Sequence, residues 1–247
     1  MIDKEILIKL AKLNGLRPWQ QEKHYIQAML LNILTEFDII FKGGTYLWFF
    51  HNLPRFSEDL DFTLMSGVID INEIKMGLEL WGIENNIRVI KDNKISFSFR
   101  ISIKGPLYTS DKDLCHVYVD ISKRETILEK PISCKLEFPA YNLPIKFIRG
   151  LSLEELAAEK IRAILTRKKA RDVYDLFYLI EQKHIPFNEE LVKTKLAYYS
   201  MDFSKQVFLE AVKNHKDNYK AELKALVFGE LPIFDEIVEK IKKWVET

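Results

Sequence analysis

The sequence predicts an α+β protein, with an N-terminal part that mixes strands with helices and a C-terminal helical bundle. Short apolar runs of strand type alternate with helical patterns as far as about residue 147, and only 3.6-residue periodicity follows. With 47% hydrophobic and 30% charged residues, the 247-residue chain can bury a large core, which excludes a mainly disordered protein. We therefore expect two domains, residues 1–147 and residues 148–247.

Hydrophobic periodicity defines the elements of the N-terminal part. Apolar stripes of helical spacing stop at Asn14-Gly15 and restart after Pro18, whereas the stretch from Leu60 to Leu64 alternates in the manner of a strand. Two glycines, Gly43 and Gly44, predict a turn between a strand and a helix. The expected helices cover residues 4–13, 19–36, 45–52 and 71–83, and the expected strands cover residues 37–42, 60–64, 87–91, 95–103 and 115–121.

The rest of the chain contains one irregular stretch and a run of helices. Residues 131–147, with Pro139 and Pro144, are expected to form an irregular crossing between the two domains. Helical periodicity then recurs in several segments, which is typical of a helical bundle. These segments are residues 153–165, 170–181, 188–196, 204–214 and 231–245.

Charge and cysteine content exclude several classes of protein. The 37 Lys and Arg residues against 36 Asp and Glu residues leave a net charge of +1, so an anion site has to be local. Cys115 and Cys134 lack a C-x-x-C spacing and are expected to be buried thiols. No apolar stretch approaches the ~20 residues of a membrane span, and residues 1–30 carry no cleavable signal. We expect a cytoplasmic protein without a membrane partner.

Two acidic residues and the glycines upstream of them carry the candidate chemistry. Asp59 and Asp61 are one residue apart in a strand pattern, so a divalent cation can lie between their carboxylates on one face. Magnesium prefers oxygen ligands and is usually held by one or two carboxylates with substrate phosphates. The glycine turn presents backbone amides before a helix, which favours phosphate binding by Gly43, Gly44 and Thr45. An ordinary turn and a solvated Asp-x-Asp pair are the alternatives for each part alone.

These motifs resemble those of a known enzyme superfamily. Gly44-Thr45, followed after thirteen residues by Asp59-Leu60-Asp61, is similar to the signature of the polymerase-β nucleotidyltransferase superfamily. More narrowly, Lys42-Gly43-Gly44-Thr45 and Arg55-Phe56-Ser57-Glu58-Asp59-Leu60-Asp61-Phe62 resemble the AbiEii/AbiGii-type nucleotidyltransferase toxins of toxin–antitoxin and phage-abortive systems. The resemblance covers most of the chain and includes Glu22-Lys23, Asp120, residues 159–163, Arg167 and residues 171–176.

The resemblance implies a polymerase-β-like mixed sheet with flanking helices and a metal-dependent transfer of a nucleoside monophosphate from an NTP to an acceptor hydroxyl. Related toxins modify the acceptor ends of tRNAs, so tRNA is the expected acceptor, a cognate antitoxin is the expected protein partner, and no DNA is expected. Asp59 and Asp61 would be ligands of Mg²⁺ or Mn²⁺. Asp120 would activate the attacking hydroxyl or bind metal, with Asp111 and Asp113 as nearby alternatives.

The resemblance also implies a set of nucleotide contacts. The implied residues are Lys42, Gly43, Gly44, Thr45, Arg55, Ser57, Arg167 and Arg171, with Lys160 as a contact of the triphosphate. Ser57 and Glu58 would orient the metal ligands, or else form a simple turn. One departure concerns the early helix, where relatives often carry Glu-Lys-Asp and this chain has Glu22-Lys23-His24.

A basic stripe is expected in the C-terminal part on physical grounds. On an uninterrupted helix at 100° per residue, Lys160, Arg167, Arg171 and Asp175 would fall within about 80° of arc. Guanidinium groups suit phosphate oxygens, so such a stripe favours an anion site, with a solvated helix face as the alternative. Arg171 and Asp172 are expected to hold the two domains in register, or to form a buried Arg–Asp pair.

Three other functions stay open at the level of sequence. The same fold could modify a protein side chain by AMPylation, or a small molecule such as an antibiotic. A non-catalytic nucleotide-binding module is the second alternative, although Gly44, Asp59 and Asp61 disfavour it. The third is a helical RNA-binding protein without activity, which the net charge of +1 disfavours because nonspecific RNA affinity rests on many phosphate contacts.

Overall fold

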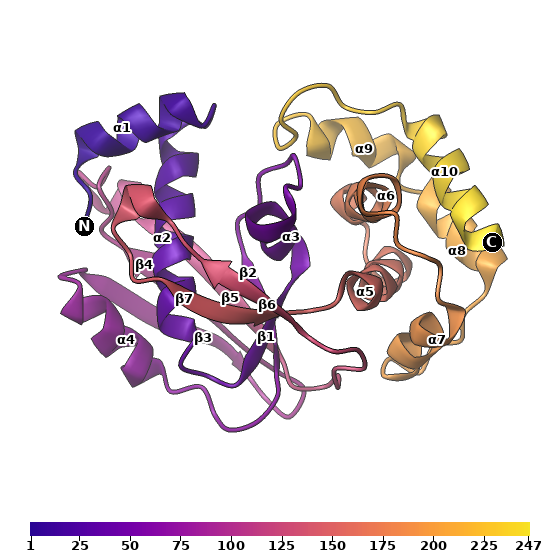
Figure 1. Ribbon diagram of the computed structural model, residues 1–247, viewed down its shortest axis with the longest axis horizontal. Coiled ribbons are helices and arrows are strands. Elements are labelled where there is room, and N and C mark those ends of the chain that lie inside the picture. The colour runs from indigo at the N-terminus through magenta and orange to yellow at the C-terminus, as the bar shows by residue number, and fades with distance from the viewer. The chain divides into compact units, whose positions relative to one another are not determined.

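The computed structural model describes residues 1–247 and contains ten α-helices and seven β-strands (Figure 1). The helices are α1 (Lys4–Leu13), α2 (Pro18–Leu34), α3 (Gly43–His51), α4 (Ile71–Leu80), α5 (Leu153–Thr166), α6 (Ala170–Lys183), α7 (Glu189–Ala197), α8 (Lys205–Lys213), α9 (Lys216–Leu223) and α10 (Phe234–Glu246). The strands are β1 (Ile39–Lys42), β2 (Leu60–Leu64), β3 (Asn85–Asp92), β4 (Ser96–Ile103), β5 (Cys115–Ser122), β6 (Ile132–Leu136) and β7 (Lys146–Gly150).

The chain divides into two compact units. The first contains Met1–Tyr46, Glu58–Thr126 and Ile132–Gly150, and the second contains Leu47–Ser57, Ile127–Pro131 and Leu151–Thr247. Each unit is therefore assembled from separate segments, whereas the sequence prediction used one boundary after residue 147. The segments 47–57 and 127–131 group with the C-terminal helices.

The first unit is built on a mixed seven-stranded sheet. Its strand order is β3-β4-β5-β2-β1-β7-β6, with parallel pairing of β2 to β5 and of β1 to β7 and antiparallel pairing elsewhere. Along β5, every second side chain is buried, from Cys115 to Ile121, and the residues between them are more exposed. This alternation gives the sheet one apolar and one polar face. The α+β class and the mixed sheet expected from the sequence are confirmed.

Helices cover the apolar face of the sheet. Helix α2 contacts β5, α4 contacts β3, and α1 packs against α2 (Figure 1). Gly77 of α4 fits closely against Ile33 of α2, because a Cβ at Gly77 would come within 3.1 Å of that side chain. The buried side chains between these elements include Met29, Phe99 and Val119 and form the core of this unit.

Strands β6 and β7 correct the sequence prediction. Residues 131–147 were expected to be irregular, but Ile132–Leu136 pairs antiparallel with Lys146–Gly150 at one edge of the sheet. The alternating pattern is weak there because apolar side chains such as Phe147 are exposed, 63% in that case. Pro139 and Pro144 lie in the connection between the strands, where a proline removes no ladder hydrogen bond.

Gly150 at the end of β7 supports the first turns of α3. A Cβ at this position would lie 2.2 Å from Cε2 of Tyr46, so only glycine lets the tyrosine ring pack on the strand. Gly150 pairs with Phe41 on β1, and the Phe41 and Tyr46 rings are 5.6 Å apart, edge to face. The start of α3 is thereby fixed against the sheet.

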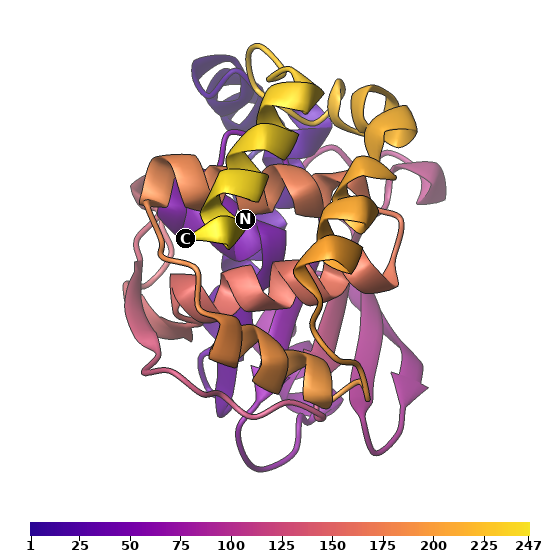
Figure 2. The same ribbon diagram turned by 90° about the vertical axis from the view of Figure 1, so that its right-hand side faces the viewer.

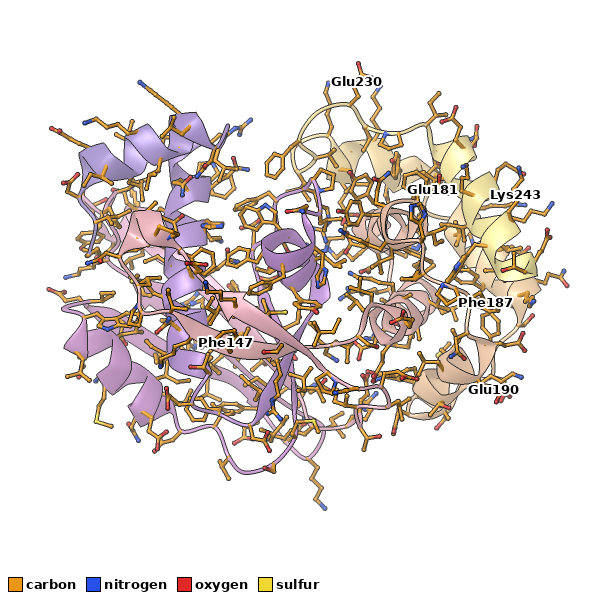
Figure 3. All side chains as sticks on the ribbon, in the orientation of Figure 1. Phe147, Glu181, Phe187, Glu190, Glu230 and Lys243 are labelled. Atoms are coloured by element: carbon orange, nitrogen blue, oxygen red, sulfur yellow. The ribbon has the colours of Figure 1, made fainter.

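The second unit is helical, as the sequence predicts (Figure 2). Helices α5 and α6 lie side by side, α10 packs on α6, and α7 packs on α5. Phe187, labelled in Figure 3, meets Trp244 of α10 edge to face at 5.1 Å. Helix α9 was not expected from the sequence. None of the helices has the length and apolar character that crossing a membrane requires.

Candidate active site

The candidate site is centred on two aspartates that neighbouring strands bring side by side. Asp61 is the second residue of β2, and its direct partner on the parallel strand β5 is Asp120. On the other side, Asp61 pairs with Lys42 of β1. Residues in register on adjacent strands point to the same face, so these three side chains form one row on the polar face. Asp61 is half-buried and Asp120 is exposed.

The carboxylate of Asp61 lies against the start of α3. Gly43 has a φ of +81°, and a Cβ on it would stand 2.3 Å from Oδ2 of Asp61. Both features require glycine, because side chains disfavour this backbone region and no other residue leaves room for the carboxylate. Gly43 therefore permits the close approach between Asp61 and the helix N-terminus.

The two glycines form the first turn of α3 rather than a separate turn before it. The sequence predicted a helix from residue 45, whereas the structure starts it at Gly43. The first amides of a helix have no partner within the helix, so they are available to an anion. Gly43 and Gly44 thus present backbone N–H groups at the end of β1, beside Asp61.

Asp59 precedes β2 and is held through its backbone. The Thr45 hydroxyl, which is fully buried, donates a hydrogen bond of 2.5 Å to the carbonyl of Asp59. The side-chain amide of Gln27 on α2 donates to the carbonyl of Glu58 at 2.9 Å, and Lys23 forms an ion pair with the Glu58 carboxylate at 2.8 Å. These contacts fix the segment that carries Asp59 and Asp61. A contact of Thr45 with the triphosphate stays a prediction, and in this structure its hydroxyl donates to the Asp59 carbonyl.

Lys42 is buried and paired with Glu125. The Lys42 ammonium lies 3.3 Å from Oε2 of Glu125, and both side chains are nearly inaccessible to solvent. Sequence reasoning missed Glu125, which is 83 positions further along the chain and carries no local signal. This ion pair places a positive charge at the end of the row formed with Asp61 and Asp120.

The donors in this row fit a hard divalent cation. Asp61 and Asp120 offer carboxylate oxygens on one face, and the backbone at Gly43 is open enough for the Asp61 carboxylate to enter. The structure contains no group of three or more His, Cys, Asp or Glu side chains arranged for a metal ion. Asp59, Asp61 and Asp120 are therefore not gathered into a three-carboxylate cage. One or two carboxylates together with substrate phosphates are the usual arrangement for Mg²⁺.

Other basic residues expected at the nucleotide belong to a buried charge network in the second unit. Arg55 donates two hydrogen bonds to Asp175, at 2.6 and 2.7 Å. The Lys160 ammonium lies 2.5 Å from Asp175 and 3.0 Å from Asp172. Arg167 donates two further bonds to Asp172, at 2.7 and 2.9 Å. Three cations and two carboxylates thus alternate along one connected chain of ion pairs.

The electrostatics of this network keep both carboxylates ionised. Burial raises the pKa of Asp172, but the charges of Lys160 and Arg167 outweigh it and hold that pKa well below its usual value. Burial also raises the pKa of Asp175, but the charges of Arg55 and Lys160 outweigh this effect and lower that pKa. The sequence offered a buried pair of Arg171 with Asp172, whereas in the structure Asp172 pairs with Lys160 and Arg167, and Arg55 pairs with Asp175. Arg171 itself is a partly exposed residue of α6.

The uninterrupted basic helix of the sequence prediction is absent. Helix α5 ends at Thr166 and α6 begins at Ala170, and Arg167 between them has an extended backbone with φ −146° and ψ 153°. Arg167 and Arg171 therefore do not continue a stripe that starts at Lys160. Contacts of Lys160, Arg55, Ser57, Arg167 and Arg171 with a nucleotide stay predictions.

Comparison with known structures identifies the fold. The chain is similar to JHP933 from Helicobacter pylori, with a TM-score of 0.63, 19% identity and coverage of 92% of this chain and 90% of that one. It is also similar to MenT4, a nucleotidyltransferase toxin from Mycobacterium tuberculosis, with a TM-score of 0.60, 18% identity and coverage of 99% and 89%. A comparison with curated proteins found no match.

A family match gives the relationship that the motifs indicated. Residues 32–240 match the family described as nucleotidyl transferase AbiEii toxin of type IV toxin–antitoxin systems. The matched region contains α3, β2 and β5, and therefore Gly43, Asp61 and Asp120. Because the match spans most of the sequence, this chain belongs to the AbiEii family of nucleotidyltransferase toxins.

Proposed function

We propose that the first unit binds an NTP with Mg²⁺ and transfers its nucleoside monophosphate to the 3′-terminal hydroxyl of a tRNA. The observation that carries this proposal is the pairing of Asp61 with Asp120 in front of the N-terminus of α3. Carboxylates and helix amides side by side suit a metal-bound triphosphate, because the carboxylates hold the cation and the amides bind the anion.

Each group has a defined task in this reaction. A bound metal ion would neutralise the triphosphate oxygens, and Asp61 and Asp59 would hold it. The amides of Gly43 and Gly44 would bind phosphate oxygens. Thr45 would act indirectly, since its hydroxyl fixes the backbone of Asp59. The role of Lys42, paired with Glu125, would be to place positive charge close to the phosphates.

The chemical step moves one phosphoryl group. The acceptor hydroxyl oxygen bonds to the α-phosphorus while the bond from that phosphorus to the oxygen bridging to the β-phosphate breaks. Pyrophosphate leaves with the electron pair, and the hydroxyl proton passes to Asp120, which acts as general base. Asp120 is suited to this task because it is exposed and stands next to Asp61.

Transfer of labelled nucleotide identifies the acceptor. The purified full chain is incubated with each α-³²P NTP and, separately, bulk tRNA, a protein extract and its small-molecule filtrate. We expect label in the tRNA fraction with the wild type and none with Asp61→Asn. As a control, Asp70→Asn keeps full transfer, because Asp70 caps α4 through one acceptor oxygen that asparagine retains. Label in protein or in small molecules instead would contradict the tRNA acceptor, and transfer by Asp61→Asn would contradict the site.

We further propose that tRNA modification is the basis of toxicity. Induced expression should then arrest growth, and sequencing of tRNA 3′ ends should reveal added nucleotides. Co-expression of a cognate antitoxin should restore both growth and unmodified ends. Growth arrest with intact tRNA ends would contradict the link between the two.

A further inference from the structure

The polar face of the sheet continues beyond the aspartates as a basic surface. On β4, Ser98 is the partner of Asp120, and Arg100 is the partner of Tyr118. On β3, Arg88 is the partner of Arg100, and Lys91 is the partner of Ser98. Partners in register share a face, so Ser98 and Lys91 continue the row of Asp61 and Asp120, while Tyr118, Arg100 and Arg88 form a second row beside it on the same face. We call the set Arg88, Lys91, Arg100 and Tyr118 the basic strand surface.

The cross-strand pair of Arg88 and Arg100 is electrostatically unfavourable by itself. Like charges directly opposite each other on antiparallel strands destabilise a sheet. Here no carboxylate pairs with Arg88, Lys91 or Arg100, although the buried cations Lys42 and Arg55 each have an acidic partner. The pair becomes favourable when an anion lies between the two guanidinium groups.

Arg100 also keeps an unused hydrogen-bond donor. Its Nε atom is buried from solvent and has no hydrogen-bond partner. A buried donor without a partner costs free energy, and a bound acceptor recovers it. The surroundings are positive: burial lowers the pKa of His116 on β5, and the charges of Arg100 and Lys23 lower it further. This part of the face is therefore prepared for an anionic group.

An exposed aromatic ring lies in the same cross-strand row as Arg88 and Arg100. Tyr118 is 45% exposed and stands beside Arg100, with Asp120 two residues further along β5. Rings next to cations are the usual means by which proteins hold single-stranded nucleic acid, because each base stacks on a ring while the phosphates meet the cations. An acidic peptide would use the arginines but not the ring.

We propose that the basic strand surface receives the 3′-terminal strand of the RNA acceptor. A backbone phosphate lies between Arg88 and Arg100, a base near the 3′ end stacks on Tyr118, and the terminal hydroxyl reaches Asp120. The geometry allows this course, since Arg100 is a diagonal neighbour of Asp120 at about 7–8 Å and β3 is about 10 Å from β5. This inference rests on the proposed function for the identity of the acceptor.

Binding measurements test the surface without relying on catalysis. The probe is a fluorescein-labelled RNA hairpin with a short single-stranded 3′ overhang, titrated with the full chain at several salt concentrations. Removing one cation that neutralises a phosphate of a single strand lowers the slope of log K against log salt by about 0.7. Because the two arginines share one phosphate in this proposal, we expect Arg88→Gln/Arg100→Gln to lower the slope by about 0.7 and the affinity at least about tenfold at ~0.1 M salt. Lys9→Gln/Lys12→Gln removes the same charge from exposed positions of α1 and should leave both unchanged.

The aromatic ring has its own matched pair of variants. Tyr118→Ala should lower RNA affinity about tenfold, because it removes the ring on which a base stacks, and Tyr118→Phe should bind as the wild type does. Affinity for NTP should be the same in all variants, since none of these residues is in the proposed nucleotide site. In steady-state assays the arginine variants should raise KM for RNA and leave kcat at saturating RNA unchanged.

The outcomes separate this inference from the proposed function. If the wild type transfers nucleotide to RNA but the arginine and tyrosine variants match the lysine control in slope and affinity, the surface is wrong and the function stands. If the variants lose RNA binding as expected but the wild type never modifies RNA, the surface stands and the function is wrong. If polyaspartate competes as well as the hairpin and Tyr118→Ala has no effect, the face is a general anion surface and the inference is overturned.

Discussion

Asp61 on β2 and Asp120 on β5 are direct partners across two parallel strands, with the start of α3 in contact with Asp61. Two like charges on neighbouring strands repel each other, and such a pair is destabilising unless a cation lies between or beside them. Lys42, the partner of Asp61 on β1, supplies one positive charge and is already paired with Glu125. A divalent cation held by the two carboxylates would offset this repulsion.

The first prediction concerns how these two aspartates act together. Asp61→Asn and Asp120→Asn should each lower nucleotide transfer at least about a hundredfold, because each removes charge from the metal and the attacking hydroxyl. If both serve one chemical step, the double variant should be no slower than the slower single variant. Single-turnover transfer rates measure this, with circular dichroism to confirm the fold. Multiplicative losses in the double variant would show that the two residues act independently.

The second prediction isolates the close approach at Gly43. Gly43→Ala and Gly67→Ala both place a side chain at positive φ, +81° and +76°, and this backbone strain alone should cost each variant about 1 kcal/mol of unfolding free energy. Only at Gly43 does the new Cβ collide with a neighbour, at 2.3 Å from Oδ2 of Asp61, whereas nothing lies within 4 Å of it at Gly67. Gly43→Ala should therefore lose transfer activity and Gly67→Ala should keep it.

Melting curves and transfer assays on the two glycine variants provide the check. Equal activity in both variants would mean that the Asp61 carboxylate can move away from α3 without consequence for the reaction.

Local sequence patterns predicted the polar strand faces that carry Asp61 and Asp120. They did not predict that the two strands pair. Alternation in residues 115–121 placed Asp120 on a polar face, and the structure agrees. That β5 would pair with β2, so that Asp120 neighbours Asp61, could not be read from sequence because 59 positions separate them. The same holds for Lys42 and Glu125. Strand order depends on tertiary packing, and no local periodicity encodes it.

Local patterns also misled where a helix break or an exposed edge was involved. The arc calculated for Lys160, Arg167 and Arg171 assumed one helix, and residues 167–169 interrupt it although no glycine or proline marks the break. In β6 and β7, exposed apolar residues such as Ile132 and Phe147 obscured the alternation that identifies a strand. In both cases contacts with the rest of the unit, rather than intrinsic preference, decide the backbone.

The third prediction concerns the charge network of the second unit. Asp172→Asn removes one of the two carboxylates that neutralise the buried Lys160 ammonium. The variant should lose about 3–5 kcal/mol of unfolding free energy at pH 7. Arg167→Gln removes a half-exposed partner and should cost less than about 1 kcal/mol. Urea titrations of both variants against the wild type measure the difference. Equal costs would show that the buried pair with Lys160 contributes little.

The pH dependence of the same network has a defined sign. Because the folded pKa of Asp172 is lowered, its stabilisation is complete above the unfolded carboxyl pKa and is lost as the pH falls towards the folded value. The gap between the wild type and Asp172→Asn should then narrow by about 1.4 kcal/mol for each pH unit below about 3.9. A gap that stays constant down to low pH would contradict the lowered pKa.

The last prediction concerns His24 of α2. Its Nδ1 lies 2.6 Å from the Tyr141 hydroxyl, and Phe138 meets the ring edge to face, so burial lowers its pKa to about 4. Between this folded pKa and the unfolded pKa of about 6.5, His24 is protonated in the unfolded chain and neutral in the folded chain. The free energy of unfolding therefore rises with pH across this window and is constant above it. His24 should therefore make the wild type roughly 2 kcal/mol less stable at about pH 4.5 than at pH 7.

A comparison of two histidine variants assigns this pH dependence. In His24→Gln the loss between pH 7 and about pH 4.5 should shrink by that amount, because glutamine does not titrate and still offers Tyr141 a polar partner. His184→Asn removes an exposed histidine at a left-handed position that asparagine tolerates, and it should retain the wild-type loss. If both variants show the wild-type loss of stability, the pKa of His24 is not lowered in the folded chain. His24 would then take up its proton in the folded chain by opening the contact with Tyr141.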